Sequence, residues 1–356
     1  MTALDFVVPE GIHDPATPSG GNTYDRHVCR GLRNLGWVVR EHAVPGGWSP
    51  RPGPRALDSL DGVMRRIPGD AVVLVDGMIA SAAPEVLVAE ARRVRLVALV
   101  HMPLGDRAQG DTPEAIRMRE YAALSAAAAV VTTSEWSRSR LLSLYQFPGE
   151  RVHVAEPGVC AAELAGGTGD GAAILCVASV IPDKGHDVLL EALRMVADLP
   201  WQCACVGRLD RDPAFVEGLR RSARDAGLDE RVHFLGPLSG PELHRCYAGA
   251  DLLVLASRAE TYGMVITEAL ARGLPVVASD VGGVTEALGY GADRTRPGWL
   301  VPVDRPAALA AALRTWLTDA ELRSRLRQVA GTRRESLPKW SDTVGKLAGI
   351  LAGPSR

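Results

Sequence analysis

The feature that most constrains this chain is an alternation of short apolar runs, rich in β-branched residues, with stretches of helical periodicity. This alternation is typical of parallel strands that are buried on both faces, with helices covering each face of the sheet. The pattern runs once through the first half of the chain and then starts again. We therefore predict an α/β protein with two doubly wound domains.

Each series predicts six strands. The first series comprises residues 4–8, 37–40, 71–75, 96–100, 129–132 and 152–155. The second comprises residues 173–178, 202–206, 231–235, 252–255, 276–278 and 299–301. Helices are expected between them, for example over 22–35, 113–126, 186–197, 213–226, 241–248 and 265–272. The end of the chain, 307–351, is predicted to be helical, with a last helix starting near Pro338.

The glycine-dense stretch Gly158–Gly171 lies between the two series and is typical of a linker. We therefore expect an N-terminal domain over residues 1–160 and a C-terminal domain over 161–336. The last helix, within 337–356, is expected to pack back on the N-terminal domain. A chain of 356 residues is long enough for two such domains, each with its own core.

Charge and composition exclude several classes of protein. The 40 Lys and Arg residues balance 42 Asp and Glu residues, which argues against a dedicated nucleic-acid binder. No apolar run approaches the roughly 18 residues that a membrane span needs, and the N-terminus lacks the basic segment of a signal peptide. None of the six cysteines forms a Cys-x-x-Cys pair, so we expect buried free thiols in a cytoplasmic protein and no metal site: Cys29, Cys160, Cys176, Cys203, Cys205 and Cys246.

Open parallel sheets bind ligands beyond the carboxyl ends of their strands, so candidate residues are those that directly follow a strand. Gly20 and Gly21 follow the first strand and open a helix. Paired glycines at a helix N-terminus let backbone N–H groups approach a phosphate, although a flexible capped loop explains them equally well. The motif is not Gly-x-Gly-x-x-Gly and no acidic residue ends the second strand, which disfavours a dinucleotide dehydrogenase.

His101 and Lys184 also follow strands. A histidine at the end of strand 96–100 can orient or polarise a substrate hydroxyl, and the alternative is a structural histidine bonded to a loop carbonyl. Lys184 is one of three lysines and lies just before a helix. A cation is poorly placed there unless an anion binds too, so we predict a phosphate-binding role over a merely solvated lysine.

The most specific motif is the pair Glu260 and Glu268. Glu260 falls in the loop after strand 252–255, and Glu268 lies in the helix that follows. Eight positions at about 100° each bring two helical side chains back to within about 80° of one another, so both carboxylates can face the same side. Paired acceptors suit vicinal hydroxyls, as on a ribose or hexose, and Gly263 leaves the start of the helix open to a diphosphate. Two solvent-facing glutamates are the alternative, which the apolar helix disfavours.

Together these residues resemble the retaining glycosyltransferases of family 4, whose GT-B fold has two Rossmann-like domains that face an inter-domain cleft. The spacing of Glu260 and Glu268 matches the family's Glu-x7-Glu signature, and residues 278–287 match the segment that follows it. The resemblance implies that Glu260 contacts the donor sugar and Glu268 the nucleotide ribose. It also places four residues between them in the donor site: Tyr262, Gly263, Met264 and Val265.

The resemblance implies roles for the other candidates as well. Gly20 and Gly21 lie near the donor phosphates, Lys184 matches the family's phosphate-binding lysine, and His101 matches its first-domain histidine. Ser179 stands where the family has an arginine. Arg208 follows a neighbouring strand and is the candidate to replace that cation.

The implied reaction moves a hexose from a UDP- or GDP-sugar to an acceptor hydroxyl with retention of configuration, without a metal or other cofactor. His101, Lys184 and Glu260 would be catalytic, while the C-terminal domain holds the donor and the N-terminal domain the acceptor. Two alternatives stay open: a nucleotide-sugar epimerase or sugar phosphorylase of the same fold, and a non-catalytic nucleotide-sugar-binding protein. The phosphorylase would need a pyridoxal-phosphate lysine, for which the sequence has no clear candidate.

The acceptor, the donor base and the oligomeric state do not follow from the sequence. Arg92, Arg93 and Arg95 form a basic group that suits either an anionic acceptor or a membrane surface. A solvated helix end accounts for them more simply.

Overall fold

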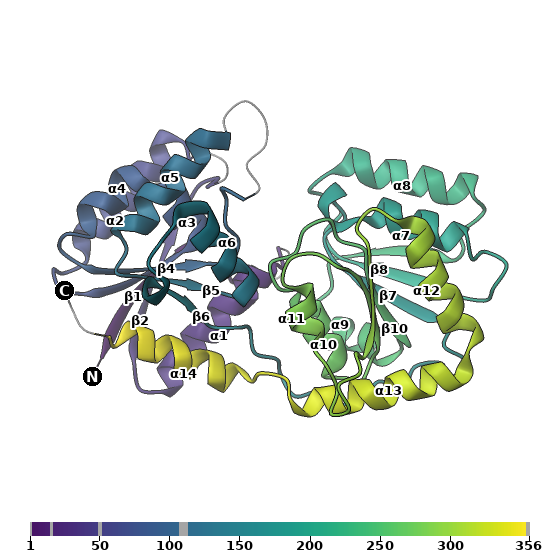
Figure 1. Ribbon diagram of the computed structural model, residues 1–356. Helices are drawn as coiled ribbons and strands as arrows, with labels where there is room; N and C mark the ends of the chain where they lie inside the picture. The colour runs from purple at the N-terminus through teal and green to yellow at the C-terminus, as the bar shows by residue number, and fades with distance from the viewer. Residues whose placement is uncertain (1, 15–16, 49–51, 107–112, 354–356) are drawn as a thin grey trace. The chain divides into compact units, whose positions relative to one another are not determined.

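The computed structural model describes residues 2–14, 17–48, 52–106 and 113–353. These residues form two compact units (Figure 1). Unit 1 contains residues 2–14, 19–158 and 338–353 of the described chain, and unit 2 contains residues 17–18 and 159–337. The chain thus leaves unit 1 near Gly158 and returns to it at Pro338, within two residues of the boundaries expected from the sequence.

Unit 1 is built on a six-stranded parallel sheet of order β2-β1-β3-β4-β5-β6. Its strands are β1 (Ala3–Pro9), β2 (Val38–Val44), β3 (Val72–Asp76), β4 (Arg95–Val100), β5 (Ala129–Thr132) and β6 (Val152–Val154). Its helices are α1 (Gly20–Asn34), α2 (Pro54–Arg66), α3 (Gly77–Ala82), α4 (Pro84–Glu90), α5 (Pro113–Ala126), α6 (Glu135–Tyr145), the 3-10 turn η1 (Gly149–Arg151) and α14 (Trp340–Leu351).

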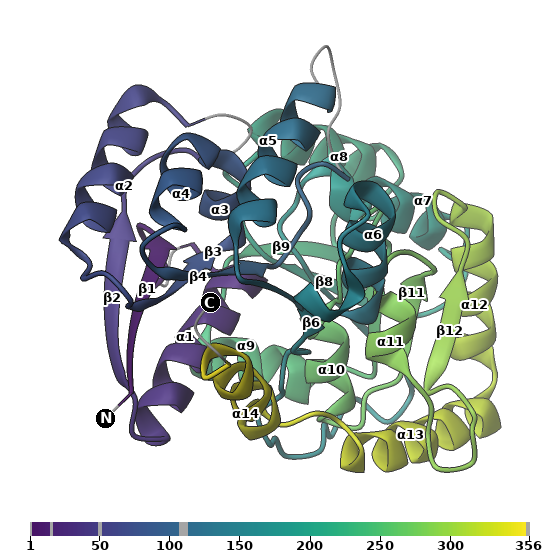
Figure 2. The ribbon, with the colours of Figure 1, turned by 60° about the vertical axis from the view of Figure 1, so that its left-hand side comes forward.

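The alternation of side chains along the strands divides the core of unit 1 into two layers, one on each face of the sheet. Val7, Val73 and Val75 belong to the layer that α2 to α6 cover. Phe6 and Leu74 are the sequence neighbours of these valines, so they point to the opposite face and belong to the layer that α1 and α14 cover. Figure 2 shows α1 and α14 side by side, as does Figure 1.

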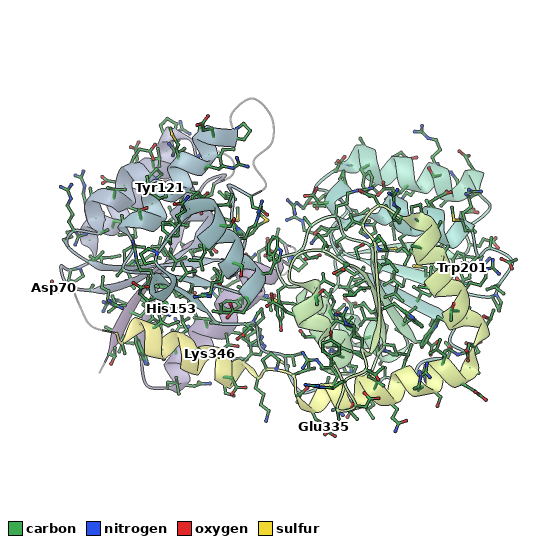
Figure 3. The ribbon with its side chains drawn as sticks, in the orientation of Figure 1. Asp70, Tyr121, His153, Trp201, Glu335 and Lys346 are labelled. Atoms are coloured by element: carbon green, nitrogen blue, oxygen red, sulfur yellow. The ribbon has the colours of Figure 1, made fainter. Side chains whose placement is uncertain are left out.

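The contacts of α14 with unit 1 are polar as well as apolar. Thr343 donates a hydrogen bond from Oγ1 to the carbonyl oxygen of Glu156 (2.7 Å), and Nζ of Lys346 lies 2.5 Å from the Glu156 carboxylate. Lys346 is labelled on this helix in Figure 3. The ring of Trp340, at the start of α14, stacks on His27 of α1 with 4.1 Å between ring centroids. The last helix is therefore an integral part of unit 1.

Unit 2 repeats the architecture with a parallel sheet of order β12-β11-β10-β7-β8-β9. Its strands are β7 (Ala173–Val177), β8 (Gln202–Val206), β9 (Val232–Gly236), β10 (Leu252–Leu255), β11 (Val276–Ser279) and β12 (Gly298–Val301). Its helices are the 3-10 turn η2 (Pro182–Lys184), α7 (His186–Arg194), α8 (Pro213–Asp225), α9 (Gly240–Ala248), α10 (Met264–Leu270), α11 (Val284–Leu288), α12 (Pro306–Thr318) and α13 (Ala320–Glu335).

The structure confirms all twelve predicted strands and changes some boundaries. β2 runs on to Val44 rather than ending at Arg40, because it is an edge strand whose polar residues hide the apolar pattern. The helical stretch predicted over 307–351 is three helices, separated at Asp319 and at residues 336–339. The last of them begins at Trp340, where the backbone N–H of Lys339 is capped by the side chain of Asp342.

The cysteines differ in part from the prediction. None of the six forms a disulfide, but Cys160, which lies in no strand or helix, is exposed, and Cys246, on a helix of unit 2, is half-buried. Among the helices of the described chain, none is both long enough and apolar enough to cross a bilayer.

Candidate functional site

Lys184 and Glu260 meet at the carboxyl edge of the unit 2 sheet. Lys184 ends the η2 turn that follows β7, and Glu260 lies in the loop after β10, the strand that pairs with β7. Nζ of Lys184 is 2.5 Å from Oε1 of Glu260. The two side chains keep 25% and 12% of their surface exposed, so both are sheltered and still reachable. The neighbouring strands thus bring together Lys184, the predicted phosphate-binding cation, and Glu260, the carboxylate predicted to accept hydrogen bonds from the sugar.

A rigid backbone supports Glu260. The hydroxyl of Ser257 donates to its Oε1 at 2.9 Å, and the backbone N–H of Gly283 donates to its carbonyl oxygen at 3.2 Å. Gly282 has a φ of 58°, and a Cβ there would lie 1.6 Å from that carbonyl oxygen. The glycine pair after β11 therefore allows one loop to pack directly against the backbone of another.

Arg258 anchors the turn that carries Lys184. Its backbone N–H donates to the carbonyl oxygen of Asp183 at 2.8 Å, and its guanidinium donates to the carbonyl oxygen of Pro182. The same guanidinium makes two hydrogen bonds to Asp187, of 2.9 and 2.7 Å, at the start of α7. Burial works to raise the pKa of Asp187, but the hydrogen bonds and charge of Arg258 lower it overall. Arg258 was not among the predicted site residues, because an arginine in a loop carries no periodic signal.

Glu268 lies on α10 and has its own set of partners. Its Oε2 accepts a hydrogen bond from the hydroxyl of Tyr247, on α9, at 2.8 Å. The guanidinium of Arg272 lies 4.4 Å from the Tyr247 ring centroid and donates to the carbonyl oxygen of Glu268. Burial raises the pKa of Glu268, although Tyr247 and Arg272 oppose the shift. This carboxylate is oriented by partners that the sequence analysis did not identify.

The residues between the two glutamates form the start of α10. Gly263 is the N-cap, and Met264 and Val265 are the first two helical residues, both half-buried. Tyr262 is buried in the core against α10 and α11. Met264 and Val265 thus keep part of their surface exposed, whereas the Tyr262 ring packs inside unit 2.

Arg208 lies beside Ser179. The backbone N–H of Val180 donates to the carbonyl oxygen of Arg208 at 2.8 Å, because β7 and β8 are neighbours. The Arg208 guanidinium makes two hydrogen bonds to Asp210, of 2.9 and 2.8 Å. These bonds lower the pKa of Asp210, whose side chain is 70% exposed. An arginine is therefore present next to the position where the family motif has one.

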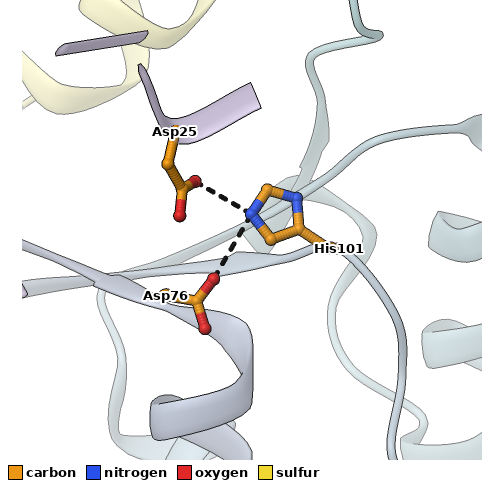
Figure 4. A group of neighbouring side chains, drawn as sticks. All are labelled: Asp25, Asp76 and His101. Atoms are coloured by element: carbon orange, nitrogen blue, oxygen red, sulfur yellow. Dashed lines mark hydrogen bonds and ion pairs between the residues drawn. The ribbon is translucent and has the colours of Figure 1, made fainter. Parts of the chain in front are cut away.

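Unit 1 presents a second group of residues at the carboxyl edge of its own sheet. Nε2 of His101, directly after β4, lies 2.9 Å from Oδ1 of Asp25 and 3.4 Å from Oδ2 of Asp76 (Figure 4). Asp25 comes from α1 and Asp76 ends β3, and both are buried. Burial works against the charged ring, but the charge of Asp25 and the hydrogen bonds to both carboxylates raise the pKa of His101 to about 10.

These carboxylates were missed, although the sequence carries a signal for each. Asp76 directly follows an apolar run, as His101 does, and Asp25 interrupts the apolar stripe of α1 that includes Val28 and Leu32. Among the described residues, the partners of the His101 ring are carboxylates rather than the loop carbonyl that the structural alternative expected. In the described chain, this is the one group of a histidine and two acidic residues in which a ring nitrogen and one oxygen of each carboxylate all lie within 4.8 Å of one another.

Gly20 and Gly21 form the first turn of α1 rather than a loop before it. Ser19 is the N-cap, and its hydroxyl accepts from the backbone N–H of Asn22 at 3.1 Å. A Cβ on Gly21 would lie 3.3 Å from Cδ2 of His101, so this turn packs closely on the histidine ring. The structure thus brings two predicted site residues, Gly21 and His101, into contact.

Two family models match the chain, one in each unit. Residues 13–163 match the model "Glycosyltransferase Family 4", and residues 167–333 match "Glycosyl transferases group 1". Together the two matches cover most of the chain and meet close to the boundary between the units.

Curated relatives carry the name D-inositol 3-phosphate glycosyltransferase. The protein of Catenulispora acidiphila is 33% identical over 83% of this chain and 76% of its own length. The protein of Jonesia denitrificans is 32% identical over 68% of this chain and 61% of its own length, and that of Thermomonospora curvata is 35% identical over 69% and 62%. The match thus spans about three-fifths of the length of the latter two relatives.

Solved structures share the fold at low sequence identity. Sucrose-phosphate synthase from Thermosynechococcus elongatus has a TM-score of 0.80 and 20% identity, covering 98% of both chains. The Anabaena protein HepE in complex with UDP and glucose has a TM-score of 0.77 and 19% identity, covering 99% of this chain and all of its own. These likenesses concern the arrangement of strands and helices.

Proposed function

This chain belongs to glycosyltransferase family 4 and has the GT-B type of fold, and from that premise we propose that it is a retaining hexosyltransferase. It would move a hexose from a nucleotide sugar to an acceptor hydroxyl. The observation that carries the proposal is the contact between Lys184 and Glu260 at the carboxyl edge of the unit 2 sheet. A cation for the diphosphate and a carboxylate for the sugar lie together there, as suits a nucleotide sugar, in which the diphosphate is bonded directly to the sugar.

Unit 2 would hold the donor. Glu260 is held by Ser257 and Lys184, which leaves lone pairs of its carboxylate to accept from sugar hydroxyls. Glu268, oriented by Tyr247, would accept from the ribose hydroxyls. A Lys ammonium has three N–H donors, and the contact with Glu260 uses one of them. The others can donate to phosphate oxygens.

The protein would stabilise the leaving diphosphate in the transition state. As the bond between the anomeric carbon and the phosphate oxygen breaks, negative charge grows on the diphosphate, where Lys184 stabilises it. Arg208, next to Ser179, would supply the second cation. The acceptor oxygen forms the new bond on the same face of the sugar, and the departing phosphate oxygen takes the acceptor proton. Glu260 and Glu268 are then binding groups rather than the acid and nucleophile of a glycosidase.

The comparisons suggest where substrate assays begin. The HepE structure contains UDP and glucose, so UDP-glucose is the first donor to test against GDP-linked sugars. Several relatives are named for D-inositol 3-phosphate, so a phosphorylated polyol is the first acceptor to test. Both choices are part of the proposal for this chain.

Calorimetric titration with a panel of nucleoside diphosphates, followed by assays with the matching sugars, tests the proposal. We expect one base to bind preferentially, slow hydrolysis of its sugar donor, and transfer when an acceptor is supplied. Conversion of the donor to another nucleotide sugar without acceptor would identify an epimerase, and phosphate-dependent cleavage a phosphorylase. Tight donor binding with no hydrolysis or transfer would identify a binding protein instead.

A further inference from the structure

One ring nitrogen of His101 serves two buried carboxylates. Nε2 lies 2.9 Å from Asp25 and 3.4 Å from Asp76, and the carboxylate side chains are 1% and 5% exposed. Asp76 has another task, since its Oδ1 caps α3 by accepting from the backbone N–H of Met78 at 2.8 Å. Oδ2 of Asp25 is buried and has no hydrogen-bond partner among the described residues.

This arrangement favours positive charge on the ring. With a neutral imidazole, two carboxylates would lie buried side by side with no charge to balance them, and one of them would have to take up a proton. Burial, with Asp76 beside it, raises the pKa of Asp25 to about 6 against the opposing effect of His101, which still leaves this carboxylate ionised at pH 7. An imidazolium balances one of the two carboxylate charges and places its Nε2–H between the two carboxylates. Among the described residues, the other aromatic group against the ring is Tyr24, which lies edge-on at 5.1 Å between ring centroids. Burial raises the pKa of the Tyr24 hydroxyl, so it stays neutral.

The same contacts fix the direction of the ring. Nε2 is turned toward the carboxylates, while Tyr24 and Gly21 pack against the ring. Figure 4 shows the other nitrogen, Nδ1, on the side of the ring that faces away from both carboxylates. The side chain keeps 17% of its surface exposed. Nε2 of His101 is thus engaged with the carboxylates, whereas Nδ1 can form a hydrogen bond with a ligand.

We propose that Asp25 and Asp76 are positioning residues that keep His101 as an imidazolium, so that its Nδ1–H is a charged hydrogen-bond donor to an oxygen of the substrate. The target is a hydroxyl or phosphate oxygen, and a group that is always protonated cannot act as a general base. The high pKa of His101 agrees with this role. The substrate part of the proposal rests on the proposed function, whereas the charge on His101 does not.

The charge is tested directly by nitrogen NMR of the protein labelled with 15N-histidine. His101 is expected to show two protonated nitrogens up to pH 8.5. His27 and His153, whose pKa values burial lowers, are expected to lose their proton at lower pH than His101 and serve as internal references. Asp25→Asn is expected to shift the His101 titration to lower pH. A neutral His101 at pH 7 in the unmodified protein would overturn the proposal, as would displacement of its ring proton by Zn2+ at micromolar concentration.

The functional part is tested by the pH dependence of kcat/KM for transfer. The unmodified enzyme should show no loss attributable to His101 between pH 6.5 and 8.5, whereas Asp25→Asn and Asp76→Asn should lose activity as pH rises through the lowered histidine pKa. His101→Gln should be about 10–150 times slower, as expected for loss of a charge-assisted hydrogen bond of about 1.5–3 kcal/mol, with no pH-dependent loss in this range. Asp5→Asn removes another buried carboxylate of unit 1, bonded to Arg40 and His42, and is the control that should leave the pH profile unchanged.

The two experiments distinguish failure of the proposal for His101 from failure of the proposed transferase function. A purely structural role for Asp25 and Asp76 predicts fewer folded molecules and an unchanged pH profile, which would overturn the positioning role. If no transfer is found with any donor, the proposed function fails while the NMR titration still decides the charge on His101.

Discussion

Nζ of Lys184 lies 2.5 Å from Oε1 of Glu260, although 76 residues separate them in sequence. Parallel pairing of β7 with β10 brings about this contact, since both residues follow the carboxyl ends of those strands. The contact links the group expected to hold the leaving diphosphate to the group expected to hold the sugar. Substitutions at the two positions should therefore have distinguishable effects.

Lys184→Ala should lower kcat far more than it weakens donor binding. Negative charge on the diphosphate grows in the transition state, so a cation there acts mainly on the rate. Lys184→Arg should recover part of the loss, because charge is kept while geometry changes. Steady-state kinetics with donor titration check this, and near-normal turnover in Lys184→Ala would remove Lys184 from the site.

Arg208→Ala should resemble Lys184→Ala if Arg208 replaces the family arginine at Ser179. The two cations would then stabilise one leaving group, so the double variant should lose less than the product of the single losses. Asp210→Ala, which removes the present partner of the guanidinium, is the matched control and should preserve turnover. Additive losses would mean that the two cations act independently.

Glu268→Ala should weaken binding of the free nucleoside diphosphate, whereas Glu260→Ala should mainly lower turnover. One carboxylate is expected to hold ribose and the other the transferred sugar, and each charge-assisted hydrogen bond contributes roughly 1.5–3 kcal/mol. Tyr247→Phe removes the partner of Glu268 and should give a smaller loss of the same kind. Calorimetry measures nucleotide binding by the three variants and steady-state kinetics their turnover. Equal affinity of Glu268→Ala and the unmodified protein would contradict the ribose assignment.

Transfer should continue in excess EDTA. Lys184, with Arg208 beside Ser179, is expected to supply the positive charge that a metal ion provides elsewhere, and Nε2 of His101 is engaged with Asp25 and Asp76. The assay compares rates with EDTA alone and with added Mg2+ or Mn2+. A complete loss on chelation that either metal restores would show that the protein's own cations are insufficient.

Glu120→Ala should strongly destabilise unit 1. The buried carboxylate accepts from the hydroxyls of Ser81 (2.7 Å) and Tyr145 (2.5 Å), and from the backbone N–H groups of Leu104 and Gly105 (both 2.8 Å). Removing it leaves four buried donors without an acceptor, and we expect the free energy of unfolding to fall by about 3 kcal/mol or more.

Hydrogen exchange of unit 1 peptides during urea unfolding measures this loss. Glu114→Ala, at an exposed position of the same helix, is the control and should change the free energy by at most about 0.5 kcal/mol. A similar stability for both variants would show that the Glu120 network contributes little.

The sequence predicted the sheets well because buried parallel strands are nearly continuous apolar runs, as in β4 and β10. It also predicted that Lys184 and Glu260 each follow a strand, which the structure confirms, while their place in a donor site stays a prediction. Their mutual contact depends on strand order, which no local pattern contains. Tyr247 and Arg258 act through contacts 21 and 71 residues away in sequence, with Glu268 and Asp187, and only the folded chain brings them there.

The return of α14 to unit 1 bears on how the protein is made. Unit 1 begins with β1 at the start of the chain, but α14 supplies part of the apolar layer that covers one face of its sheet. During synthesis on the ribosome, the first 158 residues emerge with that face partly uncovered and stay so until all of unit 2 has been translated. The core of unit 2, whose residues all lie between 159 and 337, can be completed first. The order of folding should thus run from the middle of the chain to its ends.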